Sequence, residues 1–194
     1  MKTISGKVTS RGFTLVELLI VIAILAVLSV TVVLVLNPAE LLRQSRDSTR
    51  LSDLDSINRS IALFLTDVAT TTWTATTTCT SATGTLDSPN GTACQLNAAL
   101  ATNGTGWVRG VNFSAITGGS PLARLPIDPI NSASSTACAG VVNGCYYAYR
   151  SSASFGRYKL FANMESTKFA AQGTNIKDGG NVNDWYEIGT DLSL

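Results

Sequence analysis

The sequence contains no histidine among its 194 residues, and only 14% of the residues are charged. Histidine is the commonest general base and the commonest zinc ligand, so most hydrolase and zinc-site patterns lack their central residue here. The formal net charge of +1 gives no electrostatic reason to expect nucleic acid as the main partner. The chain also lacks a G-x-S-x-G motif and a recognisable motif with two acidic residues, which makes a membrane-anchored enzyme the weakest functional hypothesis.

Charge is missing altogether from Leu18 to Leu36. Roughly 20 helical residues cross the hydrocarbon layer of a membrane, so this run is long enough to span it. Residues 1–12 carry three basic residues and no acidic one, which is typical of the cytoplasmic side of a membrane helix. A secretory signal peptide would have a shorter apolar core and a small-residue cleavage site, whereas Asn37 and Pro38 follow here.

A plain membrane anchor leaves Glu17 unexplained, because a carboxylate inside a membrane helix costs a few kcal/mol and needs a partner. Cleavage between Gly12 and Phe13 would create such a partner, an α-amino group that is mostly cationic at neutral pH. Glu17 lies about one helical turn from that amine. The carboxylate could meet the amine of its own chain or that of a neighbouring chain, and only the second arrangement would set the register of an assembly.

These residues resemble the N-terminal signal of type IV pilins and of type II secretion pseudopilins. The sequence Arg-Gly-Phe-Thr-Leu-Val-Glu at residues 11–17, followed at once by an apolar run, carries the resemblance. The resemblance implies that a prepilin peptidase cuts after Gly12 and methylates Phe13, and that Glu17 supports docking of the subunit into a growing filament.

The sequence predicts an α+β, pilin-like fold, in which a long N-terminal helix packs against a small antiparallel sheet of about three strands. We expect a leader at 1–12, a transmembrane helix at 13–37, an amphipathic continuation at 38–68, a Thr-rich loop with a connecting region at 69–144, and the sheet with a C-terminal loop at 145–194. Pro38 should kink or interrupt the helix, with Asn37 as a local cap.

Apolar residues recur at intervals of three and four after Pro38, which predicts one buried helix face. The charged residues between them, among them Arg46, Asp47 and Arg50, are expected to be solvated or paired. A short helix or turn is expected at 94–101 and a short strand at 107–113. Better strand candidates are 145–150, 157–164 and 185–189. We expect these elements to share one core, made of Leu54, Ile57, Ile61, Phe64, Tyr147, Tyr149, Leu160 and Ile188.

Four cysteines are present, and none forms a C-x-x-C pair, so zinc or redox chemistry is poorly supported. In a chain that crosses or leaves a membrane, an even number of cysteines indicates disulfides. Three pairings are open, of which short-loop closure favours Cys79–Cys94 and Cys138–Cys145. The alternative is that two or more of them stay reduced as small buried residues.

Two further segments resemble pilin-like sequences. Residues 125–131, Leu-Pro-Ile-Asp-Pro-Ile-Asn, are similar to a turn that precedes the sheet in that family. Residues 177–189 resemble the loop that binds calcium in major pseudopilins, although that loop is longer and more acidic. The resemblance makes calcium the one cofactor to consider, since oxygen ligands on a flexible loop suit this ion, whereas a metal-free turn explains the same residues. The ligand candidates are Asp178, Asn181, Asn183 and Asp184.

The expected function is that of a structural subunit of a type IV pilus or pseudopilus, without enzymatic activity. Its expected partners are copies of itself or related pilins, a prepilin peptidase, an inner-membrane assembly platform and membrane lipid. The precursor would span the cytoplasmic membrane once with its head outside, and the assembled subunit would lie in a surface filament. The alternative is a minor pilin or pseudopilin of a secretion or DNA-uptake system, acting as a binding or tip component.

Overall fold

The computed structural model describes residues 12–68, 73–81, 94–138, 144–171 and 174–194. The leader, apart from Gly12, therefore lies outside the described residues, as does part of the Thr-rich segment. The chain divides into two compact units, Met1–Leu41 and Leu42–Leu194. We call the second unit the head. Each unit is described by itself below.

The first unit contains helix α1, Leu15–Leu36, and the start of helix α2, Pro38–Asp67. The two helices are separated by Asn37, which adopts the left-handed conformation with φ 39° and ψ 73°. Asparagine tolerates this conformation better than most residues, and Pro38 fits the first position of the next helix because its missing N–H needs no partner there. The interruption predicted at Pro38 is thus present, and the first helix ends where the apolar run ends.

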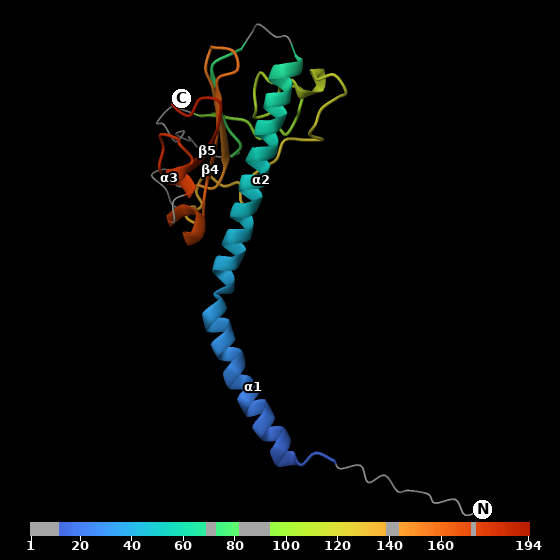
Figure 1. Ribbon diagram of the computed structural model, residues 1–194, viewed down its shortest axis with the longest axis vertical. Coiled ribbons are helices and arrows are strands. Elements are labelled where there is room, and N and C mark those ends of the chain that lie inside the picture. The colour runs from blue at the N-terminus through green and yellow to red at the C-terminus, as the bar shows by residue number, and fades with distance from the viewer. Residues whose placement is uncertain (1–11, 69–72, 82–93, 139–143, 172–173) are drawn as a thin grey trace, which may run out of the picture. The chain divides into compact units, whose positions relative to one another are not determined.

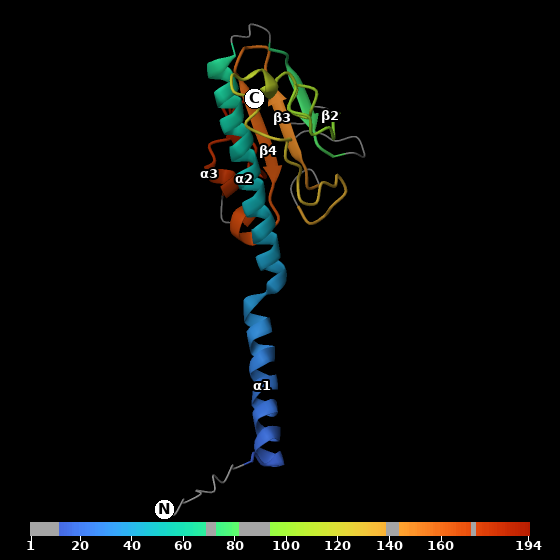
Figure 2. The ribbon, with the colours of Figure 1, turned by 90° about the vertical axis from the view of Figure 1, so that its right-hand side faces the viewer.

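In the head, one face of α2 forms half of the core. Leu54, Ile57, Ile61 and Phe64 are at most 2% exposed. They recur at the three- and four-residue spacing that places side chains on one side of a helix. Figures 1 and 2 show α2 running along one face of the sheet. All eight predicted core residues lie in or against this cluster, Ile188 being only partly buried.

The sheet has five strands in the order β2-β1-β3-β4-β5. The three strands predicted at the end of the chain form an antiparallel β3-β4-β5 unit. Strand β1 extends it antiparallel to β3, and β2 pairs with β1 in parallel, so the sheet is mixed and not purely antiparallel. The strands are β1 Thr76–Cys79, β2 Gln95–Leu96, β3 Tyr147–Ser151, β4 Tyr158–Asn163 and β5 Trp185–Gly189.

Three local predictions are wrong. The Thr-rich segment, expected to be a loop, contributes β1, because β-branched threonines suit an extended strand and β3 supplies the pairing partner. Residues 94–101 contain the short strand β2 in place of a helix or turn. Residues 107–113 do not form a strand but a chain of turns that leads into the 3₁₀ helix η1, Phe113–Ala115, because Gly110 reverses the backbone at φ 80°.

Both faces of the sheet are covered. Alternate residues of β3 and β4, such as Tyr149 and Leu160, point to α2, while their neighbours Ala148 and Phe161 point to the opposite face. The outer face carries a second, smaller core around Trp185. Segments that follow β4 include the π-helix η2, Thr167–Ala171, and the short helix α3, Thr174–Lys177. Because both faces are covered, every residue of β4 is buried.

A buried ion cluster centred on Arg50 fastens α2 to two other parts of the head. The Arg50 guanidinium donates from Nε to Asp128 Oδ2 at 2.6 Å and from Nη2 to Asp128 Oδ1 at 3.0 Å. Its Nη1 lies 2.7 Å from Asp47 Oδ1 and 2.6 Å from Glu165 Oε1. The side chains of these four residues are fully buried. The expectation that Asp47 and Arg50 are solvated is therefore wrong, while the expectation that they are paired is confirmed.

The cluster explains the turn at residues 125–131. Asp128 Oδ1 accepts hydrogen bonds from the backbone N–H groups of Ile130 and Asn131, at 2.8 and 3.1 Å, so the same carboxylate shapes the turn and holds Arg50. On the other side, Asp47 accepts backbone N–H donors from Glu165 and Ser166 just after β4. One helix thereby fixes the position of two segments far away in the sequence.

We predict that Arg50→Met destabilises the head by about 3–5 kcal/mol, because it leaves the buried carboxylates of Asp47 and Asp128 without their cation, while Glu165 keeps its pair with Arg46. The matched control is Arg59→Met on the same helix. Arg59 pairs with Asp55 at the surface, where the loss costs less than about 1 kcal/mol. The measurement is urea unfolding of the full chain in detergent, followed by the fluorescence of the three tryptophans, all buried in the head. Equal stability of the two variants would contradict the prediction.

We also predict that this cluster makes the head sensitive to acid. Burial alone would raise the pKa of the Glu165 carboxyl, but the hydrogen bonds and charges of Arg46 and Arg50 outweigh it and lower the pKa below its ordinary value of 4.5. A lowered pKa in the folded state stabilises the protein above the unfolded pKa, and this contribution is lost as the pH falls toward the folded pKa.

The difference in unfolding free energy between the wild type and Glu165→Gln should therefore be largest above about pH 5 and shrink below about pH 4. Urea unfolding at a series of pH values measures it. Asp55→Asn, which removes a surface ion pair, is the control and should stay within about 1 kcal/mol of the wild type throughout. A difference for Glu165→Gln that does not vary with pH would refute the assignment.

Candidate processing and assembly site

The bond between Gly12 and Phe13 lies in irregular backbone just before α1. Both residues are exposed, Phe13 at 86%, and a Cβ placed on Gly12 would meet nothing within 4 Å. Helix α1 begins two residues later, at Leu15. The bond is therefore exposed and is not held in a helix, which a peptidase would have to unwind.

Thr14 and Glu17 form a capping box at the start of α1. The Glu17 backbone N–H donates to Thr14 Oγ1 at 3.2 Å, and Glu17 Oε2 accepts from Thr14 N and from Thr14 Oγ1, each at 2.8 Å. A capping box satisfies backbone donors that have no partner inside the helix. The carboxylate is thus turned back toward Phe13, on the side where cleavage would create the new amine.

Helix α1 is apolar on all sides. The large apolar side chains of α1 whose burial the structure describes are between 47% and 82% exposed, so the described part of the chain covers none of its faces. The stretch Leu15–Val33 is long and apolar enough to cross a membrane. The two hydroxyl side chains in its second half bond to the helix itself: Ser29 Oγ to Leu25 O at 2.7 Å and Thr31 Oγ1 to Leu28 O at 2.8 Å. Such internal bonding is what a lipid environment requires of polar groups.

The cysteines form the two short-range pairs. Cys79 is bonded to Cys94 and Cys138 to Cys145, with Cα–Cα distances of 5.8 and 5.3 Å. The first bridge joins β1 to the residue preceding β2, and the second closes the segment that leads into β3. Glu165 lies close to the second bridge, but these sulfurs are bonded to each other and the carboxylate is paired with Arg46 and Arg50, so the group is not a metal site.

Two of the four calcium candidates are engaged by partners within the chain. Both oxygens of Asp178 are taken by backbone N–H donors, from Gly180 at 2.8 Å and from Glu187 at 2.7 Å. Asn181 Oδ1 accepts from the Lys159 ammonium at 2.6 Å. A calcium ion bound to that oxygen, at about 2.4 Å, would lie within about 5 Å of the ammonium charge. The backbone carbonyl of Asp184 accepts a hydrogen bond from Asn175 Nδ2 at 3.1 Å. Of the four candidates, Asp178 and Asn181 thus already hold partners of the chain itself, and the partner of Asn181 is a cation.

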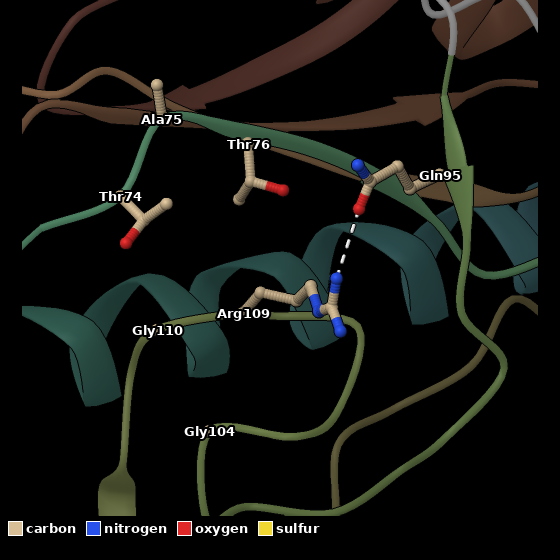
Figure 3. A pocket seen from close by; sticks show the side chains of 7 residues that line it. All are labelled: Thr74, Ala75, Thr76, Gln95, Gly104, Arg109 and Gly110. Carbon is tan, nitrogen blue, oxygen red and sulfur yellow. Dashed lines mark hydrogen bonds between the residues drawn. The ribbon is translucent and has the colours of Figure 1, made fainter.

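A polar cavity of about 320 Å³ lies at the edge of the sheet, beside β1 and β2 (Figure 3). Arg109 reaches across it and donates from Nη1 to Gln95 Oε1 at 3.0 Å. None of the N-terminal signal residues contributes to it, so it is separate from the processing site. The lining residues are Thr74, Ala75, Thr76, Gln95, Gly104, Arg109 and Gly110.

Residues 8–33 match the family described as the prokaryotic N-terminal methylation motif, the prepilin-type signal of type IV pilins and pseudopilins. No curated protein and no solved structure matches the chain. The signal and the α+β layout, a long apolar N-terminal helix plus a five-stranded mixed sheet, support a pilin-like protein. The signal points to a structural protein and implies processing by a prepilin peptidase and assembly with other pilins.

We predict that the mature chain begins at Phe13 and carries a methylated amine, which intact-mass and N-terminal peptide mass spectrometry would detect. Gly12→Leu should reduce processing at least about tenfold. The head should unfold in urea like the wild type, because a side chain at Gly12 meets open space. Unchanged unfolding with slower processing would show that the substitution acts on cleavage and not on the fold. An exported wild-type chain with an intact leader, or one cut elsewhere, would contradict the prediction.

Proposed function

We propose that the protein is a structural subunit of a type IV pilus or pseudopilus filament, held in the membrane before assembly and joined to other subunits through α1 afterwards. The observation that carries this proposal is a helix with a prepilin-type signal whose apolar side chains are exposed on every side. A separately folded head with its own core accompanies it.

The exposed helix needs an apolar environment. Each large apolar side chain that leaves water contributes about 1.5–3 kcal/mol, and α1 carries such residues along its whole length. Lipid supplies this environment for a single precursor. A bundle of α1 helices from neighbouring subunits supplies it in a filament, where close packing adds the dispersion contacts that disordered lipid tails give less well.

Glu17 is the proposed assembly residue. Among the described residues of the unprocessed chain, its carboxylate accepts from two donors of Thr14, and both are neutral. Cleavage after Gly12 places a cationic amine on Phe13, one residue before those donors. Neutralisation by the amine of the same chain lowers the cost of burying both charges. Neutralisation by a neighbour's amine does the same and also fixes how far one subunit is shifted against the next.

Such an assembly is heterologous, since each subunit uses one patch toward the subunit below and another toward the subunit above. Heterologous contacts that do not close into a ring generate open helical filaments. The chain itself then performs no chemistry. Its processing and polymerisation depend on a prepilin peptidase and on an inner-membrane assembly platform.

The proposed location follows from the same features. The precursor spans the cytoplasmic membrane through α1, with its basic leader on the cytoplasmic side. The head then lies outside the cytoplasm. Two disulfides in the head suit that location, because disulfides persist in oxidising compartments and are rare in the cytosol.

The second candidate is a minor or tip subunit that binds something through its head. The cavity at Arg109 favours it, because a guanidinium beside two threonines and a glutamine offers hydrogen-bond donors to a small polar group (Figure 3). The same α1 serves both candidates. Electron microscopy of surface filaments, with peptide identification of their main component, separates an abundant subunit from a rare one.

We predict that Glu17→Ala leaves membrane insertion unchanged and reduces incorporation into filaments at least about tenfold, the effect of losing a charge interaction of about 1.4 kcal/mol or more. Shear fractionation with quantitative immunoblotting of filament and membrane fractions measures both. Ser29→Ala is the matched control, since Ser29 is a polar residue of the same helix that bonds only to Leu25 O. It should assemble like the wild type.

Normal filaments built from Glu17→Ala subunits would refute the assembly role of the carboxylate. The proposal that this chain is a filament subunit would fall if the wild-type chain, processed at Phe13, is never found in a filament fraction.

A further inference from the structure

A lysine lies beneath the C-terminal loop of the head, on the face of the sheet that points away from α2. Lys159 Nζ is 2.6 Å from Glu187 Oε1, 2.6 Å from Asn181 Oδ1 and 2.8 Å from the backbone carbonyl oxygen of Leu192. It also sits 4.8 Å from the centre of the Phe161 ring. Both side chains of the Lys159–Glu187 pair are fully buried.

The three oxygens come from three separate segments: strand β5, the loop after α3 and the last residues of the chain. They are a carboxylate, a side-chain amide oxygen and a backbone carbonyl, the oxygen types that bind calcium in proteins. The ammonium donates hydrogen bonds to the Asn181 and Leu192 oxygens, and its charge pairs with the Glu187 carboxylate. Lys159 therefore holds together the segments that a metal ion would otherwise have to join.

We propose that the ammonium of Lys159 is the built-in cation of the C-terminal loop, and that the loop keeps its structure without calcium. The filaments that the proposed function implies would then not depend on calcium either, a consequence that rests on that function.

The loop backbone is shaped around this pair. Val182 N donates to the second oxygen of Glu187, Oε2, at 3.1 Å. A Cβ on Gly180 would come within 1.5 Å of the same oxygen, so only glycine lets the loop approach so closely. Gly189, directly opposite Lys159 in the sheet, is equally restricted, since a Cβ there would lie 2.3 Å from Tyr158 O. These contacts leave the Glu187 carboxylate engaged on both oxygens and closed to an incoming ion.

The first test compares the wild-type full chain in calcium and in chelator. Calcium at about 5 mM is enough to saturate the calcium sites of extracellular modules. We expect the thermal unfolding midpoint to change by less than about 1 °C and the rate of proteolytic cleavage within residues 178–194 to stay the same. A calcium-dependent rise of the midpoint, or protection of this segment by calcium, would overturn the proposal. This test needs no variant.

The second test removes the ammonium but keeps the length of the side chain. Lys159→Met should raise the rate of cleavage within residues 178–194 at least about tenfold while α2 stays protected, because proteolysis follows the population of the locally opened state. Lys177→Met is the matched control, an exposed lysine just before the same loop, and should behave like the wild type. Wild-type protection in Lys159→Met would overturn the proposal. Should this variant fail to fold, the calcium comparison on the wild type still decides.

The filament readout separates this inference from the proposed function. Wild-type filaments should stay intact in chelator. Filaments that dissolve in chelator, with a head that loses its C-terminal loop, would refute the inference and leave the filament assignment standing. An absence of filaments with and without calcium would count against the proposed function alone.

Discussion

The head depends on the Arg50 guanidinium, a cation with no access to water. Removing a charge from water costs several kcal/mol, so it must be matched by partners at hydrogen-bonding distance. Arg50 finds three carboxylates, from its own helix, from the turn at Asp128 and from the residue Glu165 beyond β4. Apolar contacts between α2 and the sheet tolerate small shifts, whereas a bidentate guanidinium–carboxylate pair has a fixed geometry. The cluster therefore sets how α2 and the two segments meet, and the apolar core fills the space so defined.

On the opposite face of the sheet, a different buried cation also joins segments that lie far apart in the sequence. There the Lys159 ammonium joins strand β5, the loop after α3 and the end of the chain, just as Arg50 joins α2, a turn and the end of β4. The two cations differ because their oxygen partners differ. The planar guanidinium of Arg50 suits the two carboxylate oxygens of Asp128, and the compact ammonium of Lys159 suits three separate oxygens. The irregular segments of the head are thus held by internal cations and two disulfides, with little regular secondary structure of their own.

Two local signals in the sequence predict elements well. The three- and four-residue spacing of Leu54, Ile57, Ile61 and Phe64 identified the buried face of α2, and the turn-rich and glycine-rich segments between β3, β4 and β5 marked the three strands that close the chain. What the sequence could not reveal depends on partners far away. Thr76–Cys79 become a strand only because β3 and β2 lie beside them, and a threonine run alone suits a loop equally well. The burial of Arg50 and Lys159 was missed because a charged residue between apolar ones normally faces water.

A carboxylate away from water needs a cation to compensate its charge, in α1 as in the head. The source of that cation differs between the two. Each buried carboxylate of the Arg50 and Lys159 clusters meets a cation of its own chain. Among the described residues, Glu17 Oε2 meets the hydroxyl and the backbone N–H of Thr14, and both of these donors are neutral. Within the described residues of the unprocessed chain, no cation lies beside it. Processing after Gly12 would supply one at the helix end toward which the carboxylate already points. We infer that the cut would do more than remove a leader: by completing an ion pair, it would let the helix enter an apolar bundle without the uncompensated charge of Glu17.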